Sequence, residues 1–106
     1  MKYLILAFIL FLFSSNQEVF ASSWDNNLLE AQKSYKEGNY SKAFEHYKQA
    51  QIDNPQDNQL KYNLGNSAYK SGKYTDAEKT FKSLANSDIN NNLKAKSLYN
   101  LGNTLI

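Results

Sequence analysis

The stretch SGKYTDAEKTF at residues 71–81 matches EGNYSKAFEHY at residues 37–47, with a constant offset of 34 positions. In this alignment glycine falls on glycine, tyrosine on tyrosine, alanine on alanine, and one aromatic residue on another. A fixed period of this length is typical of proteins built from stacked copies of one small unit. The sequence therefore predicts two copies of the same unit, one after the other.

Each matched residue suits a pair of helices joined by a tight turn. We expect Gly38 and Gly72 to end the first helix of each pair, because glycine adopts a left-handed backbone at the lowest cost. Ala43 and Ala77 are small, as the crossing point of two helices requires. Gly65 is small enough to let a second helix approach closely. These features together predict an all-α fold.

A second internal match extends the pattern towards the C-terminus. The motif YNLGN at residues 62–66 recurs at residues 99–103, with an offset of 37 positions. We expect the three additional residues to lie in an enlarged turn at residues 86–92, which is rich in asparagine. The five helices are predicted near residues 24–37, 41–52, 57–71, 75–86 and 91–105.

This pattern resembles the tetratricopeptide repeat. The resemblance covers repeats at about 24–57 and 58–91 and the first helix of a third at 92–106. It implies a right-handed superhelix of antiparallel helix pairs, with two full repeats plus the first helix of a third. For the helix starts, we expect Asn39 or Ser41 to cap the second helix. Thr75, with Glu78 three residues later, has the pattern of a capping box for the fourth.

Residues 1–21 have the pattern of a secretory signal peptide. Lys2 supplies a positive charge, residues 3–13 form an unbroken apolar run, and cleavage is expected after Ala21. An uncleaved anchor is the alternative, but the apolar run reaches only about 16 Å as a helix, against about 30 Å of hydrocarbon. We therefore expect an exported mature domain at residues 22–106 with no stable membrane span. The short signal and the composition favour a bacterial periplasm or cell envelope.

The resemblance also implies which side chains line the concave groove of the superhelix. They are the second, fifth, ninth, twelfth and thirteenth positions of each repeat. In this chain those residues are Leu28, Gln32, Tyr35, Lys36, Gln59, Tyr62, Asn66, Tyr69, Lys70, Lys96, Tyr99 and Asn103.

The chemistry of this set predicts a peptide-binding surface. Its four tyrosines offer broad amphipathic contacts with few bonds to immobilise. Asn66 and Asn103 can each donate to and accept from a peptide backbone. Three lysines accompany these residues and no acidic residue does, so the expected partner is a peptide with acidic character.

Two points about this set stay open at the level of sequence. Tyr35 and Tyr69 suit packing as well as binding. Asn63 and Asn100 lie one position beyond the predicted groove residues, and they suit hydrogen bonds between neighbouring helices as well as binding.

The composition counts against an enzyme and against nucleic-acid binding. Twelve basic residues against ten acidic ones give a net charge of +2, which is too small for a nucleic-acid footprint. The chain has no cysteine and a single histidine, His46. We therefore expect no thiol nucleophile, no zinc site and no Ser-His-Asp triad. We expect no cofactor and no metal, and we interpret His46 as a surface residue.

The last helix continues the core pattern to the end of the sequence. Leu98, Leu101, Leu105 and Ile106 are apolar, whereas a terminal repeat usually carries a polar face. Three explanations stay open: an unusual cap, a truncated product of a longer gene, or cover by another protein or another copy.

The motif YNLGN, followed by GKYxxA, is similar to tetratricopeptide proteins of the bacterial aerotolerance-operon (Bat-type) group. That resemblance implies an exported or membrane-tethered protein that accompanies von Willebrand A-domain proteins. The sequence thus suggests a non-catalytic interaction module that binds a peptide or protein segment in its groove. The alternatives are a self-associating structural repeat protein or a fragment of a longer envelope protein.

Overall fold

The computed structural model describes residues 26–106, which form helices and turns and contain no strand. A helix over residues 26–36 is followed by α2 (Tyr40–Asp53), α3 (Asn58–Lys70), α4 (Tyr74–Ala85) and α5 (Asn91–Thr104). The bounds of α2 to α5 differ from the predicted ones by at most one residue. The predicted all-α fold is confirmed, whereas the predicted signal peptide lies outside the described residues.

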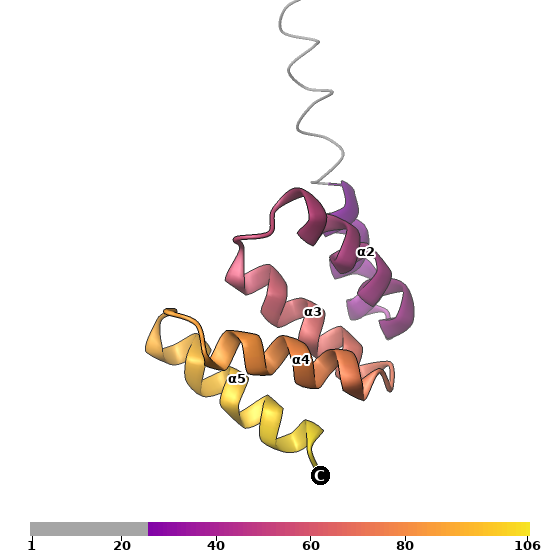
Figure 1. The fold of residues 1–106 in the computed structure, drawn as a ribbon. Helices are drawn as coiled ribbons and strands as arrows, with labels where there is room; N and C mark the ends of the chain where they lie inside the picture. The colour runs from indigo at the N-terminus through magenta and orange to yellow at the C-terminus, as the bar shows by residue number, and fades with distance from the viewer. Residues whose placement is uncertain (1–25) are drawn as a thin grey trace, which may run out of the picture.

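Neighbouring helices along the chain are also neighbours in space (Figure 1). The helix α2 packs on α3, α3 on α4, and α4 on α5, while α3 also contacts α5. The helices 26–36, α3 and α5 are the first helices of successive repeats, and α2 and α4 are the second helices. No helix among the described residues is long and apolar enough to cross a membrane.

The two predicted glycine turns have the same backbone geometry. Gly38 has a φ of 81° and Gly72 a φ of 79°, and both therefore occupy the left-handed region. At the first turn, the amide of Gly38 donates to the carbonyl of Tyr35 at 3.1 Å, and the amide of Asn39 donates to that of Ser34 at 2.8 Å. The second turn repeats both bonds at the same lengths. This is the Schellman arrangement that ends helices, so the predicted role of the two glycines is confirmed.

The helix starts confirm one predicted cap and correct another. The side chain of Asn39 accepts from the amide of Lys42 at 3.3 Å and caps α2. The predicted capping box at Thr75 is wrong, because α4 already begins at Tyr74 and its N-cap, Lys73, makes no side-chain hydrogen bond. The Schellman turn at Gly72 leads the chain directly into the helix, so Thr75 already lies in the first turn.

The prediction of an enlarged turn before the last helix needs a correction as well. The turn between α4 and α5 spans only residues 86–90, because α5 begins at Asn91. The YNLGN motif starts four residues into α3 but eight residues into α5. The additional residues therefore lengthen α5 by about one turn at its start, where Asn90 accepts from the amide of Leu93 at 2.8 Å.

The close approach predicted at Gly65 is confirmed. A Cβ atom built on Gly65 would lie 2.7 Å from Cε1 of Phe81, a distance that real Cβ atoms essentially never show. The ring of Phe81 is fully buried, as are the side chains of Leu60 and Leu84. The edge-to-face contact of Tyr62 with Phe81, 6.0 Å between ring centroids, covers the same point. The centre of the core therefore lies where α4 presses on the glycine of α3.

Candidate functional site

One hollow lies beside α3 and has a volume of about 200 Å³; we call it the inner cleft. It is bordered by first helices of successive repeats, with one ring from α4. Aromatic, amide and ammonium groups line it: Tyr35, Asn66, Tyr69, Lys70, Phe81, Asn100 and Asn103. A second hollow of about 90 Å³ shares Tyr35 and Asn66 with it and adds Tyr47 and Asn63.

The structure brings five of the twelve predicted groove residues together in the inner cleft. They are Tyr35, Asn66, Tyr69, Lys70 and Asn103. The other seven do not line it. Leu28 and the ring of Tyr62 pack against the core, although the hydroxyl of Tyr62 reaches the edge of the cleft, where it accepts from Asn100. The rest lie on the exposed surface: Gln32, Lys36, Gln59, Lys96 and Tyr99.

A hydrogen-bond network joins α3 to α5 at the edge of the inner cleft. The side-chain nitrogen of Asn100 donates to the hydroxyl of Tyr62 at 3.0 Å and to Oδ1 of Asn66 at 2.8 Å. Asn100 therefore bonds between neighbouring helices, one of the two roles the sequence left open. Asn63 instead accepts from Gln59, one turn earlier in the same helix, at 3.2 Å.

This network decides which polar groups of the cleft remain for a ligand. Asn100 uses both of its amide hydrogens on Tyr62 and Asn66. Since the oxygens of Tyr62 and Asn66 accept these bonds, what remains is the hydroxyl hydrogen of Tyr62 and the amide nitrogen of Asn66. Within residues 26–106, neither group has another hydrogen-bond partner. Together with the ammonium group of Lys70, the cleft therefore offers donors and suits a ligand rich in acceptors.

The tyrosines of the cleft are held by neighbouring rings. Tyr35 meets Tyr40 edge-to-face with 5.0 Å between centroids, and Tyr69 meets Tyr74 in the same way at 5.7 Å. Burial, with smaller contributions from the phenols of Tyr40 and Tyr62, raises the pKa of Tyr35 above its usual value. Tyr35 and Tyr69 thus both pack and line the cleft, and their rings have fixed orientations before any ligand arrives.

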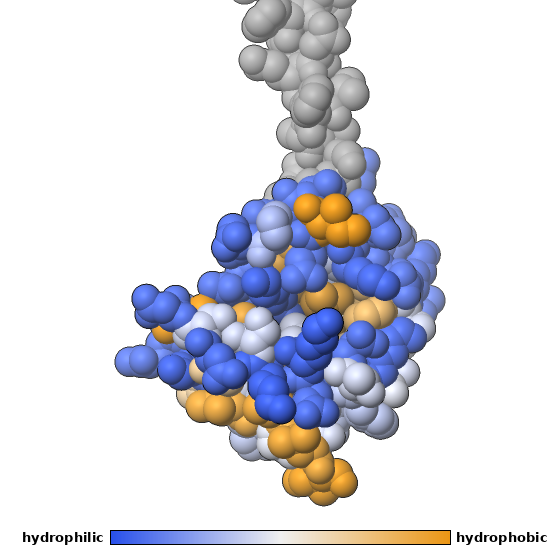
Figure 2. All heavy atoms as spheres, viewed as in Figure 1, coloured by the Kyte–Doolittle hydropathy of each residue, from blue (hydrophilic) through white to orange (hydrophobic). Residues whose placement is uncertain are grey.

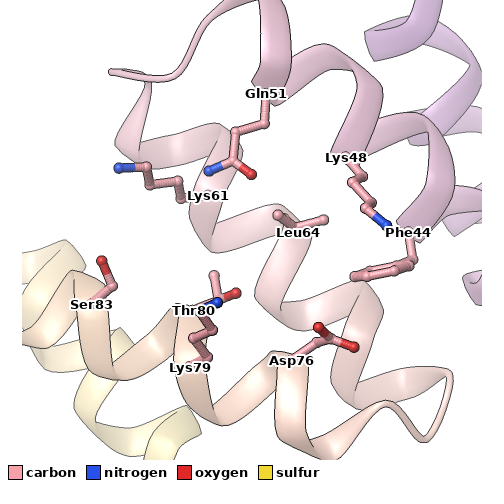
Figure 3. A pocket seen from close by; sticks show the side chains of 9 residues that line it. All are labelled: Phe44, Lys48, Gln51, Lys61, Leu64, Asp76, Lys79, Thr80 and Ser83. Atoms are coloured by element: carbon pink, nitrogen blue, oxygen red, sulfur yellow. The ribbon is translucent and has the colours of Figure 1, made fainter.

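A third hollow, which we call the outer groove, lies on the other side of α3 between α2 and α4, and has a volume of about 360 Å³. Figure 3 shows Leu64 at its centre, with the other side chains arranged around it. Two apolar side chains, three lysines, one carboxylate and three uncharged polar groups line it: Phe44, Leu64, Lys48, Lys61, Lys79, Asp76, Gln51, Thr80 and Ser83.

Sequence reasoning missed the outer groove, although its residues follow helical spacing. On α4, Asp76, Lys79, Thr80 and Ser83 lie at positions i, i+3, i+4 and i+7, which is one helix face. A helical wheel would have placed them on one stripe. It could not have revealed that this stripe faces α2 across the surface of α3.

His46 is partly buried and not simply a surface residue. Its Nδ1 atom lies 3.1 Å from Oδ1 of Asn27, so the pair links the helix 26–36 to α2. Residues 26–106 contain no group of three histidine, cysteine or acidic side chains that could hold a metal ion.

Comparison with known proteins gives one match. A family model described as "Tetratricopeptide repeat" matches residues 34–101. The search of curated proteins found no match. The search of solved structures also found none.

Proposed function

Because the chain belongs to the tetratricopeptide repeat family, whose repeats mediate protein–protein interaction, we propose that it binds a peptide segment of a partner protein in the inner cleft. The proposed role is that of a non-catalytic scaffold. The observation that carries the proposal is the Asn100 network, which leaves the cleft with unpaired donors.

The donors of the cleft define the partner's chemistry. The hydroxyl of Tyr62 and the amide of Asn66 suit main-chain carbonyl groups, and the ammonium of Lys70 suits a carboxylate. The fixed rings of Tyr35 and Tyr69 supply contact area at a low entropic cost. A peptide with at least one acidic residue fits these groups best.

Binding of displayed peptides to the full chain tests this proposal. We expect selection from a random library to enrich acidic sequences. In a variant combining Tyr62→Phe, Lys70→Gln and Asn103→Ala, affinity should fall at least tenfold, because hydrogen bonds typically contribute about 0.5–1.5 kcal/mol each. Tyr62→Phe keeps the ring that packs on Phe81 but removes the acceptor of one Asn100 hydrogen bond, so circular dichroism checks that the helices are retained.

The matched control is Lys79→Gln, which removes a lysine from the outer groove and leaves the inner cleft unchanged. Equal binding by the triple variant and the unmodified chain would contradict the proposed cleft.

We also propose that the protein is exported to the bacterial periplasm or cell envelope, and that a von Willebrand A-domain protein is its partner. Export is supported by the signal pattern of residues 1–21, and the partner by the Bat-type resemblance alone.

N-terminal sequencing of the secreted chain should read from Ser22. Retention of residues 1–21 would indicate an anchored protein, and failure to copurify with an A-domain protein encoded beside it would exclude that partner.

Self-association is a second candidate function, and the apolar surface of α5 favours it. Leu98 is 51% exposed and Leu105 is 60% exposed. Figure 2 shows hydrophobic atoms gathered along α5 and towards its C-terminal end. If this surface joins two copies, sedimentation at tens of micromolar should detect a dimer that Leu98→Lys abolishes. A monomer under those conditions would rule out this function.

A further inference from the structure

We propose that the outer groove is a second docking surface, which binds a partner segment carrying acidic residues around one apolar side chain. The groove lies on the opposite side of α3 from the inner cleft and shares no lining residue with it. The proposal therefore stands independently of the function proposed for the cleft.

The floor of the groove is apolar, and only a small part of it is exposed. Phe44 from α2 is 6% exposed and Leu64 from α3 is 7% exposed, and both border the hollow. Its volume of about 360 Å³ lies in the range of clefts that bind ligands in proteins. One aliphatic or aromatic side chain laid on Phe44 and Leu64 would remove this remaining apolar surface from water.

The rim of the groove is basic, and its ammonium groups lack carboxylate partners. Each of the three helices contributes one lysine: Lys48 from α2, Lys61 from α3 and Lys79 from α4. Asp76 is the single acidic residue among the lining side chains. The one ion pair found within residues 26–106 joins Lys82 to Glu78, so none of the three lysines is paired with a carboxylate.

Aromatic contacts hold ammonium groups close to the apolar floor. The Nζ atom of Lys48 lies 5.8 Å from the ring centroid of Phe44, and that of Lys73 lies 5.4 Å from the same ring. A cation over a ring is attracted to its face. An acidic side chain next to a docked apolar residue would therefore lie close to a positive charge.

The arrangement favours a peptide over a small anion. The three lysines come from three helices, and Leu64 lies between Lys61 on one side and Phe44 with Lys48 on the other (Figure 3). A phosphate group needs donors that converge on one point, usually with backbone amides among them. Separate lysines around an apolar centre suit separate carboxylates spaced along a chain.

Fluorescence anisotropy with the full chain and a defined probe tests the proposal. The probe is a labelled peptide with one leucine flanked on each side by two glutamates, and glutamines replace the glutamates in the control peptide. We expect the acidic probe to bind with an affinity that falls as salt rises, and the control peptide to bind at least tenfold more weakly. The variant Lys48→Gln/Lys61→Gln/Lys79→Gln should weaken binding of the acidic probe about tenfold.

Two matched variants keep the result specific. Asp76→Asn removes the one negative charge of the groove, so it should bind the acidic probe more tightly, in the opposite direction to the lysine variant. Lys33→Gln/Lys42→Gln/Lys94→Gln removes the same number of exposed lysines, none of which lines the outer groove or the inner cleft, and should leave binding unchanged. Circular dichroism of every variant checks that the helices are retained.

Three results would overturn the proposal. They are equal binding by the outer-groove variant and the unmodified chain, loss of binding in a Lys70→Gln variant but not in the outer-groove variant, and displacement of the probe by millimolar phosphate at constant ionic strength. The second result would assign acidic peptides to the inner cleft, and the third would assign a small anion to the outer groove.

Discussion

Gly65 and Gly102 hold the same place in two copies of the YNLGN motif, yet their surroundings differ. A Cβ on Gly65 would collide with the ring of Phe81, whereas a Cβ on Gly102 meets nothing within 4 Å. The same residue type is therefore a packing requirement at one position and only a cost in helix propensity at the other.

This difference predicts opposite effects of the same substitution. Gly65→Ala should destabilise the protein by about 1–3 kcal/mol, as overpacking of a core does. Gly102→Ala should stabilise it by about 0.5–1 kcal/mol, because alanine favours the helix. Urea unfolding of both variants measures the two values, and a similar loss in both would show that another surface covers Gly102.

Tyr47 makes stability dependent on alkaline pH. Burial, with a smaller contribution from the phenol of Tyr35, raises its pKa above the usual 10.0. The folded chain therefore keeps this proton at a pH where the unfolded chain loses it, and folding stability falls as pH rises above 10. Tyr47→Phe retains the ring and removes the titrating group, so stability should fall less steeply above pH 10.

Chemical unfolding at a series of pH values measures this slope. Tyr99→Phe serves as the control, because Tyr99 is 71% exposed and the substitution should leave the slope as it is. A slope unaffected by Tyr47→Phe would contradict the assignment.

At the scale of the element, local backbone chemistry fixes where each helix begins. The side chain of Asp57 accepts from the amide of Leu60 at 3.0 Å and caps α3, whereas α4 starts at Tyr74 without a side-chain cap. The capping-box pattern at Thr75 failed because a Schellman turn three residues earlier had already set the start of the helix.

Two alanine substitutions separate a real cap from an apparent one. Asp57→Ala should destabilise the protein by about 1 kcal/mol, the usual cost of losing an N-cap. Thr75→Ala should leave stability unchanged or raise it by up to about 0.5 kcal/mol, since alanine is the better helix former. Thermal unfolding compares them, and a larger loss for Thr75→Ala would restore the capping box.

At the scale of the whole molecule, each helix depends on its neighbours in the stack. α5 is held by α4 and by the Asn100 network to α3. In such an array, a change at one interface is felt mainly by the adjacent elements.

Asn100→Ala should therefore loosen α5 selectively. Loss of its two hydrogen bonds should cost about 1–3 kcal/mol, and hydrogen exchange should speed up in α5 more than in α2. Asn103→Ala is the control, because Asn103 is exposed on the same helix. Equal exchange rates in α5 for the Asn100→Ala variant and the unmodified chain would show that the network does not hold this helix.

The amino-acid sequence was enough to predict the helical fold, the glycine turns and, to within one residue, the bounds of α2 to α5. These depend on backbone preferences and on spacing within one helix, which are local properties. The contacts between side chains of different helices, in contrast, depend on how the helices pack. Asn100 reaches Tyr62 and Asn66 across 38 and 34 residues, and the lysines of the outer groove come from three helices. Spacing fixes the face of a helix, but the angle and position at which helices pack decide what that face touches.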